Sequence, residues 1–206
     1  MDDIAGPDIK RMVVVSVFIA GAISVLLHAL FPISILGEFS RVGSISSIVA
    51  AFWYYFNRWG WKNRYFRMFG WLCDYPDLNG RWEGTVNRLG ENDPHLFVME
   101  IYQTFFEIHV STFTKNSEGS SIVANLMTDK LRSNFKLIMT WKCRTRRLGG
   151  DGKEEFTGTS IIKLSESGGT RYLDDEYYTR RNPQTQGELH LNFIGNECYN
   201  RWEKSI

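Results

Sequence analysis

The chain has 206 residues, enough for one ordinary domain or for a small domain with an appendage. Its 24 lysine and arginine residues nearly balance its 23 aspartate and glutamate residues, giving a net charge of +1. This balance excludes an acidic disordered tail and a polybasic binder of DNA or RNA. Hydrophobic residues at 43% predict a packed core, and the three cysteines show no metal or disulfide spacing, so a reducing compartment is expected.

The first third of the sequence predicts a hairpin of two membrane-spanning helices. An uncharged run extends from Met12 to Gly37, and its part before Pro32 is long enough to cross a bilayer core about 30 Å thick. A second uncharged run, Val42 to Asn57, is short, but flanking arginine and aromatic side chains can complete it. A cleaved signal peptide or a pair of buried soluble helices fits less well, because a second apolar run follows at once and the first has almost no polar face.

Basic residues set the expected orientation of this hairpin. Lys10 and Arg11 precede the first run, and Arg41 is the only basic residue in the loop between the two runs. Four basic residues follow the second run: Arg58, Lys62, Arg64 and Arg67. The positive-inside rule therefore places both termini in the cytoplasm, with a short loop outside.

Both runs carry small side chains four residues apart, a spacing that lets helices approach closely in lipid. These residues are Ser16, Ala20 and Ser24 in the first run, and Gly43, Ser47 and Ala51 in the second. They suit either closure of the hairpin or contacts between copies of the chain, and both alternatives stay open. His28 continues the first stripe as an ionisable group inside the membrane, and the sequence assigns it no proton-transfer role.

The remainder of the chain predicts an antiparallel β-barrel. Residues 59–72 are basic and aromatic and are expected to continue the second helix into the headgroup region, until Tyr75-Pro76-Asp77 ends it. Period-two alternation then predicts about eight strands, separated by turn residues, as in a closed up-and-down barrel or a sandwich. The expected strands are Leu78–Val86, Leu96–Tyr102, Phe105–Thr114, Ser120–Thr128, Asn134–Arg144, Phe156–Leu164, Arg171–Thr179 and Gly187–Phe193.

The predicted organisation is thus a helical hairpin with its collar over residues 1–72 and an eight-stranded antiparallel barrel over residues 73–206. A barrel of this size holds one small ligand. No catalytic constellation emerges: the histidines are scattered, the glycine-rich segment before Lys153 does not match a phosphate-binding loop, and Gly-x-Ser-x-Gly is absent. We therefore expect a protein that is not an enzyme and that holds neither a metal nor a cofactor.

Aromatic, hydroxyl and basic side chains along the predicted strands can instead form a ligand site. Aromatic rings stack on bases, hydroxyl and amide groups bond to base edges or sugars, and arginine meets phosphate. The candidate ligand-binding residues are Trp82, Tyr102, Gln103, Thr112, Ser120, Trp141, Ser160, Tyr178 and Arg180.

Several segments carry a resemblance to a known family. Tyr75–Gly84 contains Gly80-x-Trp82, which resembles the opening signature of lipocalin barrels, where the tryptophan plugs one end. Further motifs are Ile101-x-Gln103, the Thr- and Ser-rich turn Thr112–Ser121, and Tyr177–Gly187. Following two N-terminal spans, these motifs resemble the two-transmembrane, β-strand-rich effectors of bacterial CBASS antiphage systems, which are associated with CD-NTase enzymes.

The resemblance implies a barrel that binds a cyclic dinucleotide made by a cognate CD-NTase during phage infection. Ligand binding would drive homo-oligomers to form in the inner membrane, where the helices disrupt the membrane lipids and kill the infected cell. The resemblance does not place the nucleotide's contacts. Two alternatives stay open: a membrane-anchored lipocalin-like binder of an apolar ligand, which requires an all-apolar interior, and a membrane-anchored hydrolase, which the absent catalytic constellation disfavours.

Overall fold

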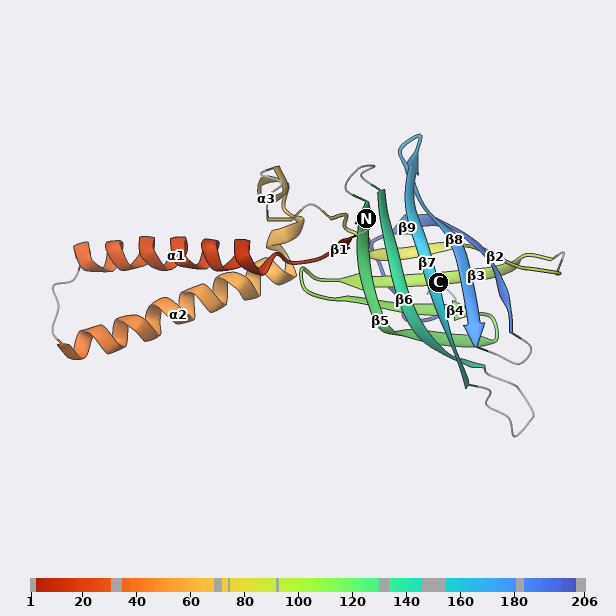
Figure 1. The fold of residues 1–206 in the computed structure, drawn as a ribbon, viewed down its shortest axis with the longest axis horizontal. Coiled ribbons are helices and arrows are strands. Elements are labelled where there is room, and N and C mark those ends of the chain that lie inside the picture. Colours follow the sequence, from red (N-terminus) through yellow and green to blue (C-terminus); the bar gives the residue numbers. More distant parts are fainter. Residues whose placement is uncertain are drawn as a thin grey trace. The chain divides into compact units, whose positions relative to one another are not determined.

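The computed structural model describes residues 3–30, 35–68, 72–73, 75–91, 93–129, 134–145, 155–180 and 184–202 (Figure 1). The chain divides into two compact units. The barrel unit comprises Met1–Gly6, Tyr75–Gln103 and Glu107–Ile206, and the helical unit comprises Pro7–Asp74 with Thr104–Phe106.

The helical unit is built on two long helices, α1 (Ile9–Leu30) and α2 (Ile35–Arg58). Asp8 caps α1, since its Oδ1 accepts hydrogen bonds from the backbone N–H groups of Lys10 and Arg11 at 2.9 and 3.3 Å. Among the described residues, α1 alone is long and apolar enough to cross a membrane, with a mean hydropathy of 2.5. The predicted first span is therefore a real apolar helix, whereas a second crossing by α2 remains a proposal.

The small-residue stripes face different surroundings within this hairpin. Ser16 is half-buried between the helices, and its Oγ accepts a hydrogen bond from Trp53 Nε1 at 2.9 Å. The second stripe, Gly43, Ser47 and Ala51, is exposed. A Cβ added at Gly43 would meet no atom within 4 Å, so this stripe does not contribute to packing of α1 against α2.

The predicted continuation of the second helix through residues 59–72 is wrong. After α2, a 3-10 turn, η1 (Gly60–Lys62), precedes a separate short helix, α3 (Arg64–Met68). The second helix ends at Arg58, because the backbone of Trp59 leaves helical geometry. Asn63 separates η1 from α3: its backbone is extended, and its Oδ1 accepts a hydrogen bond from Tyr65 N at 3.0 Å. Trp61 is fully buried, so this segment supplies part of the core of the helical unit as well as surface.

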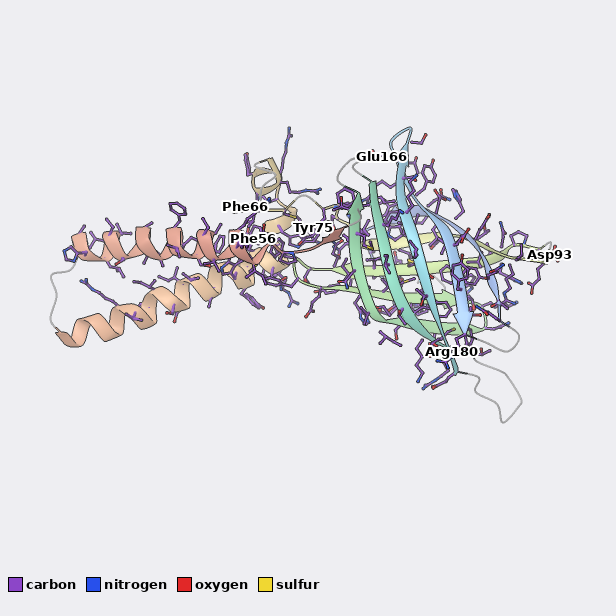
Figure 2. All side chains as sticks on the ribbon, viewed as in Figure 1. Phe56, Phe66, Tyr75, Asp93, Glu166 and Arg180 are labelled. Atoms are coloured by element: carbon purple, nitrogen blue, oxygen red, sulfur yellow. The ribbon has the colours of Figure 1, made fainter. Side chains whose placement is uncertain are left out.

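An aromatic cluster forms the base of the helical unit. Phe56 packs edge-on against Phe66, with ring centroids 5.3 Å apart (Figure 2), and against Phe105 at 4.9 Å. The backbone N–H groups of Phe105 and Phe106 donate to Asn57 O and Oδ1 at 3.0 and 3.1 Å. These bonds occupy the backbone that the sequence assigned to the start of a strand at Phe105, and that strand begins instead at Ile108.

The barrel unit contains all eight predicted strands, each within a few residues of its expected bounds. They are β2 (Gly80–Arg88), β3 (His95–Gln103), β4 (Ile108–Thr114), β5 (Ser117–Asp129), β6 (Asn134–Thr145), β7 (Glu155–Ser167), β8 (Thr170–Arg180) and β9 (Gln186–Gly195). Consecutive strands pair antiparallel, and the β2–β9 pair completes a closed barrel, as predicted. A further strand, β1 (Asp3–Ala5), pairs with β5 and was not predicted, because three residues are too few to show alternation.

One end of the barrel is filled by side chains. We name it the closed end, and β2 begins there. The opposite end is the open end, and it carries the connections β2–β3, β4–β5, β6–β7 and β8–β9. Trp82 is fully buried near the closed end, and its Nε1 donates to Leu78 O at 3.0 Å. Arg171 lies 3.9 Å over the Phe193 ring, which packs on Trp82. Gly80 has φ 123°, and a Cβ there would lie 2.2 Å from a backbone oxygen of β9, so this kink requires glycine.

Candidate functional site

A cavity occupies the open end of the barrel. Its volume is about 100 Å³, smaller than the roughly 300–1,000 Å³ of most small-molecule sites, and its mouth opens to solvent. Every strand from β2 to β9 contributes to its wall, because period-two alternation points every second side chain inward. The apolar lining residues are Val86, Phe97, Met99, Met139, Trp141, Cys143, Phe156 and Leu189. The polar ones are Arg88, His95, Thr112, Thr114, Ser117, Ser160, Tyr177, Thr179 and Thr185.

Trp141 presents its indole ring to this cavity. A Cβ at Gly158 on β7 would lie 2.3 Å from the Trp141 ring, so the glycine leaves room for the indole to lie across β7. The Trp141 Nε1 donates to Ser160 Oγ at 2.9 Å, which fixes the orientation of the ring. The result is a held, half-buried aromatic surface of the kind on which a nucleobase stacks.

Tyr177 provides an unsatisfied polar group in the same cavity. Its side chain is 8% exposed, and among the described residues its hydroxyl has no hydrogen-bond partner. Burial raises the pKa of Tyr177 above its ordinary value, against the opposing effect of the nearby Arg88 charge, so the phenol is protonated at neutral pH. A buried hydroxyl without a partner is costly in an empty protein and becomes satisfied when a ligand accepts its hydrogen bond.

Two basic side chains that line the cavity share one carboxylate. Arg88 Nη1 lies 3.3 Å from Glu91 Oε1, and His95 Nε2 lies 2.8 Å from Glu91 Oε2. The hydrogen bond to His95, and then that to Arg88, lowers the pKa of Glu91, so its carboxylate is ionised at neutral pH. All three side chains are partly exposed, which places this cluster where the cavity meets solvent.

The structure brings together three of the nine predicted ligand-binding residues: Thr112, Trp141 and Ser160 all line the cavity. Trp82 and Gln103 are buried outside its lining, and Gln103 holds the entry to β2 through Leu78 N, 2.8 Å from its Oε1. The remaining four residues have exposed side chains outside the cavity (Arg180 is labelled in Figure 2): Tyr102, Ser120, Tyr178 and Arg180. A ligand-binding role for any of the nine stays a prediction.

Sequence reasoning missed Arg88 and His95, and of two neighbouring tyrosines it placed Tyr178 rather than Tyr177 in the ligand site. The alternation contained a signal for Arg88 and for Tyr177. Counting in twos from Trp82 along β2 reaches Arg88, so both point inward. Counting in twos from buried Leu173 along β8 reaches Tyr177, whereas the predicted Tyr178 lies on the opposite face. His95 pairs with Val86 across the β2–β3 hairpin, a contact that the sequence does not show.

Comparison with known proteins agrees with this geometry. The family described as Cap15, cyclic dinucleotide receptor domain, matches residues 73–192, more than half of the chain and nearly all of β2 to β9. No curated protein matches the chain. The matched segment contains the entire wall of the open-end cavity, and a receptor domain of this kind takes a cyclic dinucleotide as its ligand. The chain therefore belongs to the Cap15 cyclic dinucleotide receptor family of CBASS effectors.

Proposed function

We propose that the open-end cavity is the receptor site for the cyclic dinucleotide. Tyr177 carries this assignment, because its buried hydroxyl lacks a partner that a ligand would supply. Trp141 offers a stacking surface for a base, and Arg88 offers a guanidinium for a phosphodiester. Thr112 and Ser160 retain their predicted role as hydrogen-bonding groups of the wall. In this proposal the protein acts as a sensor without catalysis, its ligand comes from a cognate CD-NTase, and it binds neither DNA nor RNA.

The test is calorimetric titration of the full-length protein in detergent with a panel of cyclic dinucleotides. Tyr177→Phe is expected to weaken binding about 2- to 10-fold, the usual effect of one lost hydrogen bond to a ligand. Tyr102→Phe is the matched control, since Tyr102 is 53% exposed on the outer face of β3. Equal effects of the two variants, or an effect of Tyr102→Phe alone, would contradict the assignment to the cavity.

A second candidate ligand is an apolar molecule, because about half of the cavity-lining residues are apolar. Such a ligand would leave the hydroxyl of Tyr177 unsatisfied, so removing this hydroxyl would leave its affinity unchanged or raise it. Tyr177→Phe would then bind a fluorescent fatty acid as well as the wild type or better, while cyclic dinucleotides would not displace it.

We further propose that the protein resides in the bacterial inner membrane through α1 and α2, with both termini cytoplasmic, and that ligand binding assembles several copies that disrupt the lipid bilayer. Support comes from the exposed stripe Gly43, Ser47 and Ala51, which packing of the hairpin leaves unused. Small residues on an open helix face let a second helix approach closely in lipid. On α1, Ser24 and His28 are also exposed, whereas Ala20 is half-buried like Ser16.

Gly43→Leu tests the assembly step. A Cβ added at Gly43 meets no atom within 4 Å and the position is exposed, so the hairpin should form normally while close approach of another copy is blocked. We expect ligand-dependent killing of expressing cells to fall while ligand affinity stays at the wild-type value. Val42→Leu is the control, because Val42 is 63% exposed one residue away on α2. Undiminished killing by Gly43→Leu would remove the stripe from the mechanism.

A further inference from the structure

The mouth of the cavity contains an anion that belongs to the chain itself. Glu91 places one carboxylate oxygen against Arg88 and the other against His95, at 3.3 and 2.8 Å. Both basic side chains line the cavity, whereas Glu91 does not. The carboxylate thus engages the two basic side chains of the lining from outside the ligand space.

The position of Glu91 makes this engagement easy to reverse. It lies in the turn after β2, where its backbone N–H donates to Arg88 O at 3.1 Å. The side chains of Glu91, Arg88 and His95 are 46%, 38% and 49% exposed, and ion pairs so open to water contribute little to stability. Displacing the carboxylate therefore requires neither unfolding of a strand nor desolvation of a buried charge.

A phosphodiester is bound by the same kinds of hydrogen-bond donor as this carboxylate. It carries one negative charge spread over two non-bridging oxygens, and each oxygen accepts hydrogen bonds from groups such as guanidinium and imidazole. The Arg88 and His95 side chains already face one such pair of oxygens. Arg88 and Tyr177 line the same cavity, so the guanidinium and the buried hydroxyl face one ligand space.

We propose that Glu91 is a built-in substitute for the ligand's phosphate, which holds Arg88 and His95 in place in the empty receptor and is displaced when a cyclic dinucleotide binds. This inference rests on the proposed function of the cavity.

The substitute also favours a complete ligand over a simple anion. An anion that reaches only the mouth exchanges one set of contacts with Arg88 and His95 for an equivalent set, and gains little. A cyclic dinucleotide reaches further, to the Trp141 ring and the buried Tyr177 hydroxyl. Glu91 would thus raise the concentration needed for response while suppressing occupancy by inorganic phosphate and mononucleotides.

The chain provides a matched control for Glu91. Glu155 bridges two basic residues in the same manner, with Lys142 Nζ at 2.6 Å and Arg144 Nη2 at 2.7 Å. It also lies near the open end, at the start of β7, and is similarly exposed, but none of these three residues lines the cavity. Replacing Glu155 changes the net charge by the same amount without freeing a basic group of the cavity.

The experiment compares Glu91→Gln, Glu155→Gln and Arg88→Ala with the wild type, all full length in detergent, by calorimetric titration with the cyclic dinucleotide panel and with inorganic phosphate. Glu91→Gln is expected to bind the cyclic dinucleotide about 3- to 10-fold more tightly and to show a steeper loss of affinity with salt. It should also bind phosphate detectably. Glu155→Gln should stay within about twofold of the wild type, since Glu155 pairs with basic residues outside the cavity lining and solvent screens its charge. Arg88→Ala should bind more weakly.

Unchanged or weaker binding by Glu91→Gln, with binding by the wild type intact, would overturn the inference alone and would assign Glu91 to positioning Arg88. An equal gain for Glu155→Gln would also overturn it, as a general effect of net charge. Failure of the folded wild type and of Glu91→Gln to bind any cyclic dinucleotide would overturn the proposed function, and this inference with it.

Discussion

Arg81 and Glu100 form a buried ion pair on the outer face of the barrel, and breaking it should be strongly destabilising. Arg81 is 2% exposed and Glu100 is 3% exposed, with Arg81 Nη1 2.7 Å from Glu100 Oε1. Burial opposes the charge of Arg81, but its hydrogen bonds to Glu83 and Glu100 outweigh that effect and leave its pKa above the ordinary value. The Arg81 guanidinium is therefore charged in the folded protein.

The same pair holds the C-terminal segment against the barrel. Arg81 donates to the backbone oxygens of Arg201 and Trp202 at 2.9 and 2.7 Å. Glu100 accepts from the backbone N–H groups of Tyr199 and Asn200, each at 2.8 Å. Removing the guanidinium would leave a buried carboxylate without its cation and would release two carbonyl oxygens at once.

We expect Arg81→Met to lower the free energy of unfolding by about 3–5 kcal/mol, the usual result of removing one partner of a buried pair. If the free energy of unfolding falls by about 2 kcal/mol per molar urea, the urea midpoint of the detergent-solubilised protein should fall by roughly 2 M. Tryptophan fluorescence reports this unfolding transition. Trypsin should also cleave after Arg201 at lower enzyme concentration. The double variant Arg81→Met/Glu100→Leu should recover part of the loss, because it leaves no unpaired charge.

Arg144→Met is the control for this series, since Arg144 is 52% exposed in its pair with Glu155 and should leave the midpoint nearly unchanged. If Arg81→Met changed the midpoint no more than Arg144→Met, the reasoning from burial would be refuted, because the pair would then behave as a solvated one.

Two further substitutions test the cores of the two units. Trp82→Ala should destabilise the barrel by about 3–5 kcal/mol in the same urea assay, because it empties the fully buried closed end, and an unchanged midpoint would show that Trp82 is not core. Phe105→Ala should loosen the helical unit, since Phe105 is 2% exposed and stacks on Trp53 at 6.3 Å. We expect faster proteolysis near residues 59–68 and a red shift of tryptophan emission, and wild-type proteolysis rates would contradict the packing.

Most of the barrel could be predicted from the sequence because a closed sheet imposes a strict period of two on every strand. Asn134–Arg144 shows this best: Leu137, Met139 and Cys143 alternate with mostly polar residues and are all buried. The errors fall where tertiary contacts override that pattern. Phe105 reads as part of a strand, yet Asn57, nearly fifty residues earlier, holds its backbone in the helical unit.

The site was predictable only in part, because alternation identifies the faces of a strand but not which face is inward near its end. Choosing Tyr178 instead of Tyr177 moved the prediction to the outer surface, although both side chains carry the same chemistry. Arg88 and His95 escaped notice for a different reason. The turn between them brings their side chains to one carboxylate, and a balanced net charge conceals a local cluster of this kind.

The passages of the chain between its two units all adjoin one end of the barrel. The chain passes between the units after Gly6, after Asp74 and on either side of Thr104–Phe106. Each passage adjoins the closed end of the barrel. The first follows β1, which pairs with the last part of β5; the second leads into β2, which begins at that end; and Thr104–Phe106 lies in the loop that joins β3 to β4. The cavity lies at the other end of the same strands. Strands β2 to β5 therefore contribute residues to the cavity at one end, and at the other end they adjoin the passages of the chain into the helical unit.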